Sequence, residues 1–183
     1  RCAEAVALLP RQPRVVVNLQ GDAPLTPAWY VEGLVEAMLV DPEISVATPV
    51  LHASAGHLRR LRQDRQAGRV GGTTAVLDRH RNALYFSKEV LPFTDHDFAD
   101  GEQTGVHHHV GVYAYTPQAL IAYGALPQGT YELREGLEQL RYLENGLPVR
   151  CVEVEARSRE FWELNNPSDI ATIEAIMKKE GLE

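Results

Sequence analysis

The chain has 183 residues, of which 44% are hydrophobic and 23% are charged, and its formal net charge is −7 at pH 7. This composition is typical of a globular domain with its own core and excludes a disordered chain, and an acidic chain lacks the basic surface that nucleic-acid binding needs. Two cysteines without a CxxC pattern indicate a reducing compartment, and no apolar run reaches the ~20 residues of a membrane span. We therefore expect one domain over residues 1–183, in the cytoplasm, with no membrane or nucleic-acid partner.

The first part of the chain predicts helices and strands in alternation. Residues 3–9 are typical of a helix end closed by Pro10, and Val15–Leu19 is typical of a strand buried on both faces. Thr26 and Pro27 predict the N-cap and first residue of a helix, whose apolar face is Val31, Leu34, Val35, Met38 and Leu39. Asp41-Pro42 ends this helix, and Ser45–Val50 predicts a second buried strand.

The middle of the chain predicts a hairpin between two polar segments. Residues 52–71 are rich in arginine and predict a short helix followed by a loop. Thr73–Leu77 and Ala83–Ser87 predict two strands joined by a turn, and residues 92–107 predict a loop dense in Asp and His.

The last part returns to alternation. Val110–Tyr115 predicts a strand, Thr116-Pro117 a capped helix, and Val149–Val154 another strand. The spacing over 131–145 predicts one helix ended by Gly146, with inward residues Leu133, Leu137, Leu140 and Leu143. The final helix follows Asn166-Pro167 and packs through Ile170, Ile173, Ile176 and Met177. The alternation predicts an α/β sandwich on a mostly parallel sheet.

The run Gln20-Gly21-Asp22 follows the first predicted strand directly. In open α/β sheets, ligands bind beyond the carboxyl ends of strands, so Asp22 is a candidate metal ligand and Gly21 permits close approach of backbone or ligand. The alternative is a plain turn in which Asp22 accepts hydrogen bonds from nearby backbone N–H groups.

A second candidate ligand lies before the last helix, in WELNNPSDI. Asn166 is the natural helix cap, which leaves the side-chain oxygen of Asn165 available. Mg²⁺ prefers carboxylate and carbonyl oxygens together with substrate phosphates, so Asp22 and Asn165 can form a two-point site for it.

Two further segments carry polar side chains. In HHHVGVYAY, adjacent strand residues alternate faces, so the histidine run is a poor zinc site, and His107 and His108 are expected at a loop tip. His109 and Tyr113 are expected to face one cleft, where both can hydrogen-bond an anionic or hydroxylated substrate. Glu138 and Gln139 lie on the predicted helix 131–145, where a solvated face is the simpler interpretation.

Four segments together resemble the 3-deoxy-manno-octulosonate cytidylyltransferases, a family of sugar nucleotidyltransferases. They are VVVNLQGDAPL, AVLDRHRNALYFSKEVLPF, HHHVGVYAYTPQAL and YELREGLEQLRYLENGLPVRCVEVE, which fall in the family's order over nearly the whole chain. The resemblance implies a three-layer nucleotide-diphospho-sugar transferase fold with a mixed sheet. It also implies transfer of CMP from CTP to the acidic sugar 3-deoxy-manno-octulosonate (Kdo), for lipopolysaccharide synthesis, by a Mg²⁺-dependent homodimer.

The resemblance also assigns residues. Asp22 matches the family's metal-binding Asp, and Arg1 matches an arginine that binds substrate. The positions that bind the sugar acid correspond to Gln20, His109, Tyr113, Glu138 and Gln139. Two positions depart from the family pattern: Ala23 replaces a Glu, and Asn165 replaces the second metal carboxylate, which leaves one negative charge fewer for the cation.

The chain resembles the family from partway through its fold. About two βαβ units, on the order of 60–75 residues at ~30 per unit, are expected before Arg1, and they carry the first strand and the triphosphate-binding loop. Two alternatives to Kdo transfer therefore stay open. One is transfer of CMP to another acidic sugar, such as a sialic acid or 8-amino-Kdo, and the other is a non-catalytic relative that dimerises.

Overall fold

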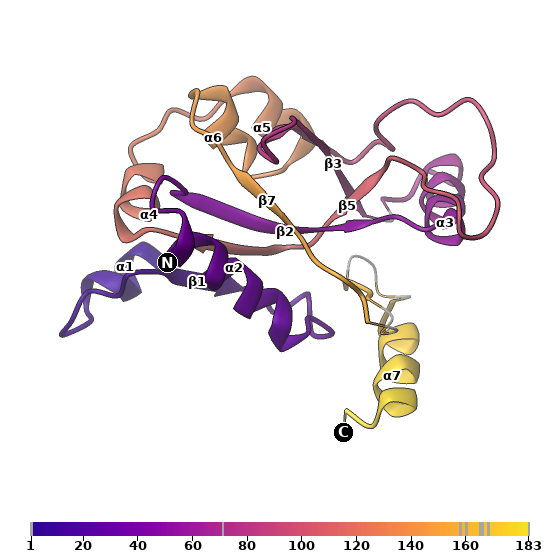
Figure 1. Ribbon diagram of the computed structural model, residues 1–183, viewed down its shortest axis with the longest axis horizontal. Helices are drawn as coiled ribbons and strands as arrows, with labels where there is room; N and C mark the ends of the chain where they lie inside the picture. Colours follow the sequence, from indigo (N-terminus) through magenta and orange to yellow (C-terminus); the bar gives the residue numbers. More distant parts are fainter. Residues whose placement is uncertain are drawn as a thin grey trace.

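The computed structural model describes residues 2–70, 72–157, 159, 161–164, 167 and 169–182. Its helices are α1 (Cys2–Ala7), α2 (Ala28–Val40), α3 (Ala55–Gln66), α4 (Pro117–Tyr123), α5 (Thr130–Glu135), α6 (Leu140–Glu144) and α7 (Asp169–Glu180). Its strands are β1 (Val16–Leu19), β2 (Val46–His52), β3 (Thr73–Leu77), β4 (Ala83–Ser87), β5 (His107–His109), β6 (Val112–Tyr115) and β7 (Arg150–Glu153). Figure 1 shows β2 through the middle of the molecule, with α2 below it and α5 and α6 above it.

The strands described here form one seven-stranded sheet in the order β1-β6-β2-β5-β3-β4, with β7 paired to β2. The α/β class and the mixed sheet are confirmed. A mostly parallel sheet is wrong for the described pairings, because β2 and β7 run parallel while the other paired strands run antiparallel. A parallel pair needs a long crossover, whereas a tight turn joins β3 to β4 and a loop without a helix precedes β5.

Helices bury apolar side chains on both faces of the sheet. On one face, Tyr30, Leu34 and Met38 of α2 pack with Ala47, Val112 and Ala114. On the other face, Leu140 and Tyr142 of α6 pack with Val46, Val50 and Phe86. Successive residues of a strand point to opposite faces, so β2 contributes Val46 and Val50 to one core and Ala47 to the other.

The start and the buried face of α2 differ from the sequence prediction. The N-cap residue is Pro27, and no side-chain hydrogen bond caps the helix, so Thr26 is not the cap. Tyr30, Leu34 and Met38 are buried, whereas Leu39 is 41% exposed. The buried face of α2 is therefore centred on Tyr30, Leu34 and Met38 and does not include Leu39. Tyr30 lies four residues before Leu34 and so adds a large ring to the same face.

The best-predicted elements are the hairpin and the second capped helix. β3 and β4 have the predicted bounds, and Thr116 accepts a hydrogen bond from the Ala119 N–H at the start of α4, with Pro117 in the first turn. The helix in residues 52–71 is longer than expected, because α3 reaches from Ala55 to Gln66.

Two other expectations are wrong in part. β1 is only partly buried, because it forms the end of the strand order and Leu19 is 56% exposed. The single helix expected over 131–145 is two short helices, α5 and α6. Gly136 ends α5 with φ 64°, a left-handed conformation that stops the helix and leaves Leu133 65% exposed.

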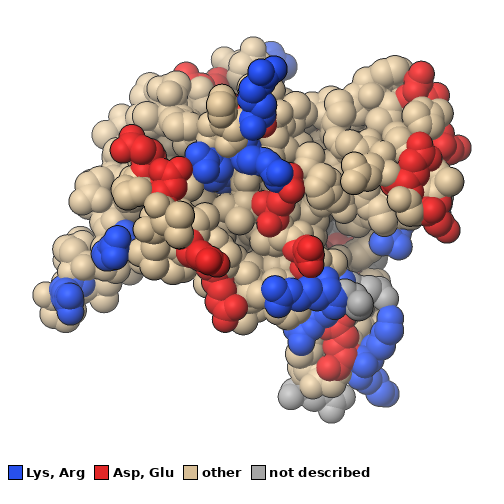
Figure 2. Space-filling view, in the orientation of Figure 1, with Lys and Arg blue, Asp and Glu red and all other residues tan. Residues whose placement is uncertain are grey.

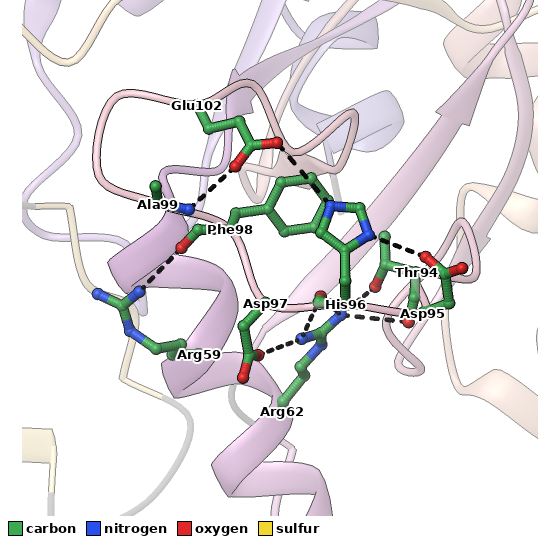
Figure 3. Close-up of polar contacts among 9 residues, drawn as sticks. All are labelled: Arg59, Arg62, Thr94, Asp95, His96, Asp97, Phe98, Ala99 and Glu102. Carbon is green, nitrogen blue, oxygen red and sulfur yellow. Dashed lines mark hydrogen bonds and ion pairs between the residues drawn. The ribbon is translucent and has the colours of Figure 1, made fainter.

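The loop between β4 and β5 is fixed onto α3 by arginines (Figure 3). Arg59 Nη1 donates to the Phe98 carbonyl at 3.3 Å, and Arg62 Nη1 lies 3.1 Å from Asp97 Oδ1. Arg59 Nη2 also lies 3.2 Å from Asp100 Oδ1. Arg62 also donates to the main-chain carbonyls of Thr94 and His96. These arginines are thus engaged within the chain, and the acidic side chains of the loop stand out at the right of Figure 2.

No helix in the described ranges is both long and apolar enough to cross a membrane.

Candidate active site

The antiparallel pairing of β1 with β6 determines where the candidate site forms. Asn18 lies opposite Tyr113 and Leu19 opposite Val112, so Gln20 comes beside Gly111. A Cβ atom added to Gly111 would lie 3.1 Å from Gln20 Oε1. The end of β1 and the bend before β6 therefore meet at one edge of the sheet, as the sequence predicts for the Gln20 segment.

Glu163 joins this edge from the segment before α7. Its Oε1 accepts a hydrogen bond of 2.9 Å from the Gly111 N–H, and a Cβ on Gly111 would lie 3.3 Å from the same oxygen. Only a residue without a side chain leaves room for both the Gln20 amide and this carboxylate. Glu163 is not among the predicted site residues, although it lies two residues before the predicted ligand Asn165.

Asp22 lies on the exposed turn that follows β1. Its carbonyl accepts a hydrogen bond of 2.8 Å from the Leu164 N–H, so the turn and the segment 161–164 lie side by side. A Cβ on Gly21 would meet nothing within 4 Å, which confirms open space beside this turn. Asn165, the second predicted metal ligand, lies outside the described residues, as do Asn166 and Arg1.

His109 is buried and is held in one tautomer. Its Nε2 lies 2.9 Å from Thr48 Oγ1, and the Thr48 hydroxyl donates to the Val112 carbonyl at 2.8 Å. A hydroxyl has one proton, so His109 Nε2 is the donor to Thr48 and Nδ1 is left as an acceptor. Burial lowers the pKa of His109 to about 3, so the ring is neutral near pH 7.

Tyr113 is 8% exposed and lies beside His109, with ring centroids 5.5 Å apart and the ring planes tilted by 43°. Burial, then Tyr115 and the charges of Glu163 and Glu138, raise the pKa of Tyr113 well above its ordinary value. The phenol is therefore protonated and can donate a hydrogen bond. His109 and Tyr113 therefore share one face, as the sequence predicts.

Glu138 and Gln139 lie in the short link between α5 and α6, not within one long helix. Glu138 is exposed, and its carbonyl accepts a hydrogen bond of 3.3 Å from the Tyr123 hydroxyl. Gln139 is 4% exposed, and its Nε2 is buried with no hydrogen-bond partner among the described residues. An unpaired buried amide costs ~1–3 kcal/mol, and this N–H group can still donate a hydrogen bond to a further acceptor.

The described site thus offers donors and acceptors from distant parts of the chain. Gln20, Tyr113 and Glu163 lie around Gly111, His109 adjoins Tyr113, and the Glu138 charge reaches Tyr113. The oxygen of Asp22 suits a hard cation, and it is the one predicted metal ligand within the described residues. Such a site can orient a polyhydroxylated acid beside a cation.

Comparisons with known proteins agree with this chemistry. The model of the cytidylyltransferase family matches residues 1–154. A 3-deoxy-manno-octulosonate cytidylyltransferase from Maricaulis maris (strain MCS10) is 38% identical over 99% of this chain and 69% of its own length. One from Anaeromyxobacter sp. (strain Fw109-5) is 37% identical over 97% of this chain and 66% of its own length.

Two solved structures are also similar. CMP:2-keto-3-deoxy-manno-octonic acid synthetase complexed with CTP has a TM-score of 0.76 and 28% identity, and the match covers 97% of this chain and 66% of that one. A 4-diphosphocytidyl-2C-methyl-D-erythritol synthase from Anaerococcus prevotii has a TM-score of 0.51 and 12% identity over 96% of this chain and 64% of that one, a likeness of fold alone.

Proposed function

We propose that this chain, which belongs to the cytidylyltransferase family, transfers CMP from CTP to 3-deoxy-manno-octulosonate and releases pyrophosphate. The family model covers residues 1–154, and the curated relatives that match nearly the whole chain are 3-deoxy-manno-octulosonate cytidylyltransferases. The chain spans about two thirds of the length of these relatives, 69% of the Maricaulis maris protein and 66% of the Anaeromyxobacter protein. The activity of the whole protein is therefore our inference.

The observation that carries the proposal is the likeness to a synthetase solved with CTP, which extends over 97% of this chain. The described site adds support for an acidic, hydroxylated substrate. Gln139 and Tyr113 supply buried donors that a sugar carboxylate or hydroxyl can accept from, and Glu163 and Glu138 supply acceptors. Glu163 and Glu138 repel the carboxylate of the sugar acid and can accept hydrogen bonds from its hydroxyls. We therefore expect the hydroxyls, and not the carboxylate, to face these two residues.

The reaction is an in-line displacement at the α-phosphorus of CTP. The anomeric oxygen of the sugar forms a bond to phosphorus, the bond to the bridging oxygen breaks, and pyrophosphate leaves as the hydroxyl loses its proton. Catalysis then depends on orientation of the two substrates and on neutralisation of phosphate charge. We assign the orientation of the sugar acid to Gln20, His109, Tyr113, Glu138 and Gln139.

We assign Mg²⁺ binding to Asp22 together with Asn165, and we propose that Arg1 contacts a substrate. When bound, Mg²⁺ supplies positive charge to the phosphate oxygens. One carboxylate and one amide leave most of the coordination sphere to water and phosphates, which is how Mg²⁺ is usually held at nucleotide sites. The exposed position of Asp22 on an open turn is compatible with a ligand shared with a nucleotide.

The test is pyrophosphate release by the purified protein, whose intact mass is measured first, with CTP, Kdo and Mg²⁺. Asp22→Asn is expected to lower kcat/KM at least about a hundredfold, because the metal ligand loses its charge. Glu43→Gln, which changes an exposed acid before β2, is the control and is expected to keep full activity. If Asp22→Asn released pyrophosphate with the kcat/KM of the native protein, the metal site assigned to Asp22 would be wrong.

The acceptor sugar is tested in the same assay. Kdo is expected to be the best acceptor among Kdo, 8-amino-Kdo and a sialic acid. Turnover of the sialic acid alone would overturn the Kdo assignment. No pyrophosphate with any sugar would favour the non-catalytic alternative.

We further propose a homodimer in the cytoplasm that contributes to lipopolysaccharide synthesis. These proposals rest on the resemblance to the cytidylyltransferase family. Light scattering on the protein as it elutes from a size-exclusion column tests the dimer, since it measures molar mass independently of shape. We expect twice the mass of one chain.

A further inference from the structure

A second group of polar side chains lies on the sheet face that carries His109, and the proposed reaction does not use it. His52 of β2 is directly opposite His107 of β5, so both point to the same face. Glu153 of β7 is opposite Val50, two residues before His52, and therefore faces the same way. Each of these three residues offers one ligand atom, and the atoms all lie within 4.8 Å of one another.

The distances between the histidine nitrogens and the Glu153 oxygens are longer than those of ordinary hydrogen bonds and leave room for a cation between these atoms. His52 Nε2 lies 3.4 Å from Glu153 Oε2, and His107 Nε2 lies 3.7 Å from Glu153 Oε1. Zn²⁺ binds histidine nitrogen at ~2.0–2.1 Å, so two ligand atoms of a tetrahedral site are separated by ~3.3 Å. The side chains are thus already near the spacing that such an ion requires.

The two histidines are in a suitable location. The Nε2 atom of His107 is buried and has no hydrogen-bond partner among the described residues. The two rings lie 4.5 Å apart between centroids, and the His52 side chain is 59% exposed, which gives an ion access from solvent.

Arg81 fixes the carboxylate of this group. It forms an ion pair with Glu153 Oε1 from the turn between β3 and β4, and this contact lowers the pKa of Glu153. The carboxylate is therefore ionised and oriented, with Oε2 facing His52. Carboxylates that bind metals are commonly held by such an outer hydrogen bond, although the positive charge of Arg81 opposes a cation and limits the affinity.

We propose that His52, His107 and Glu153 bind a Zn²⁺ ion, with water at the fourth position. Zn²⁺ accepts two imidazoles and one carboxylate as ligands, whereas the two imidazole nitrogens are poor ligands for Mg²⁺, which prefers oxygen. The ion links β2, β5 and β7, three strands that are far apart in the sequence. This site is separate from the all-oxygen Mg²⁺ site assigned to Asp22, and it does not depend on the proposed reaction.

The experiment titrates the metal-free protein with ZnCl₂ in a calorimeter. We expect one equivalent to bind, an excess of Mg²⁺ not to compete, and Co²⁺ in place of Zn²⁺ to give the visible absorption of a tetrahedral complex. His52→Ala and His107→Ala are each expected to weaken Zn²⁺ binding at least about tenfold. His80→Ala, at an exposed histidine outside the group, and Asp22→Asn are expected to leave it unchanged.

Three other outcomes of the titration would contradict a Zn²⁺ site at His52, His107 and Glu153. Equal Zn²⁺ binding in His52→Ala and the native protein would overturn the proposal, as would the absence of binding in the native protein. Loss of the Zn²⁺ equivalent in Asp22→Asn would place the ion at the nucleotide site instead. His52 is exposed, so its variant is expected to fold, and Glu153→Gln tests the third ligand if His107→Ala loses its native circular dichroism.

Discussion

At the residue scale, the unpaired amide of Gln139 is the most informative part of the site. Its Nε2 is buried without a partner among the described residues, which lowers the stability of the free protein, and the proposed function gives this donor an acceptor on the sugar. We predict that Gln139→Leu raises KM for Kdo at least about tenfold while the free energy of unfolding stays equal or rises by up to ~2 kcal/mol. Steady-state kinetics and urea denaturation measure the two effects.

A structural role for Gln139 predicts the opposite combination. In that case Gln139→Leu would lower the free energy of unfolding and leave KM for Kdo unchanged. Gln118→Leu, which changes an exposed glutamine on α4, is the matched control for the change in polarity.

Gly111 is the second residue whose role can be isolated. A Cβ atom there would lie 3.1 Å from Gln20 Oε1 and 3.3 Å from Glu163 Oε1, both at the ends of flexible side chains. We predict that Gly111→Ala folds with a change in stability within about 1 kcal/mol but lowers kcat/KM about tenfold, because both site side chains must move. Gly56→Ala on α3, where the Cβ would make an ordinary 3.7 Å contact, is expected to keep kcat/KM, and equal losses in the two variants would contradict the prediction.

At the scale of the elements, the α5–α6 unit depends on a buried ion pair. Arg141 Nε donates to Glu132 Oε2 at 2.8 Å and Nη2 to Oε1 at 2.6 Å, and Glu132 is 4% exposed. The ion pair with Arg141 is the main cause that lowers the pKa of Glu132. Loss of Arg141 leaves a buried carboxylate without its partner, so we predict that Arg141→Met costs about 3 kcal/mol in urea denaturation.

The double variant provides the control for this pair. Glu132→Leu combined with Arg141→Met removes both charges and is expected to cost less than Arg141→Met alone. A double variant that is less stable than the single one would show that the other contacts of Glu132, such as the hydrogen bond of 3.0 Å from Gln128 Nε2, matter more than the unpaired charge.

The elements also show what sequence alone can predict. The β3–β4 hairpin was predicted to the residue, because its strands and turn are close in the chain and their signals are local. The strand of His107–His109 was missed, because its partners are His52 in β2 and Thr73 in β3, and no local pattern reveals such distant pairing. The helix over 131–145 failed because apolar spacing outweighed Gly136, whose left-handed φ of 64° ends α5.

The site residues, like the elements, were predictable only where a local sequence pattern marks them. Gln20, His109, Tyr113, Glu138 and Gln139 came from the resemblance, and the described structure shows how the β1–β6 pairing and the α5–α6 link position them. Glu163 was not found, because its partner Gly111 is 52 residues away and a lone glutamate carries no distinctive pattern. Their roles stay predictions until the kinetics are measured.

At the scale of the whole molecule, buried histidines make stability depend on pH. Burial lowers the pKa of His57 to about 4 and of His109 to about 3 from an ordinary value of 6.5, and it lowers the pKa of His108 as well. Between the lowered and the ordinary values, the unfolded chain binds more protons than the folded one. The contribution of these histidines to the free energy of unfolding is therefore fully present above pH 6.5. It is lost as the pH drops below that value.

We predict a loss that approaches about 1.4 kcal/mol per pH unit for each such histidine as urea denaturation in EDTA is followed from pH 6.5 to pH 5. The lowered carboxylate pKa values of Glu132 and Glu153 act below their ordinary value of 4.5, outside this range. His109→Gln is expected to reduce the slope by close to one proton, and His80→Gln, at an exposed position, to leave it unchanged. A slope that is the same in His109→Gln and the native protein would mean that His109 does not remain neutral in the folded chain, and its Nδ1 would then carry a proton and could not be the acceptor assigned to it.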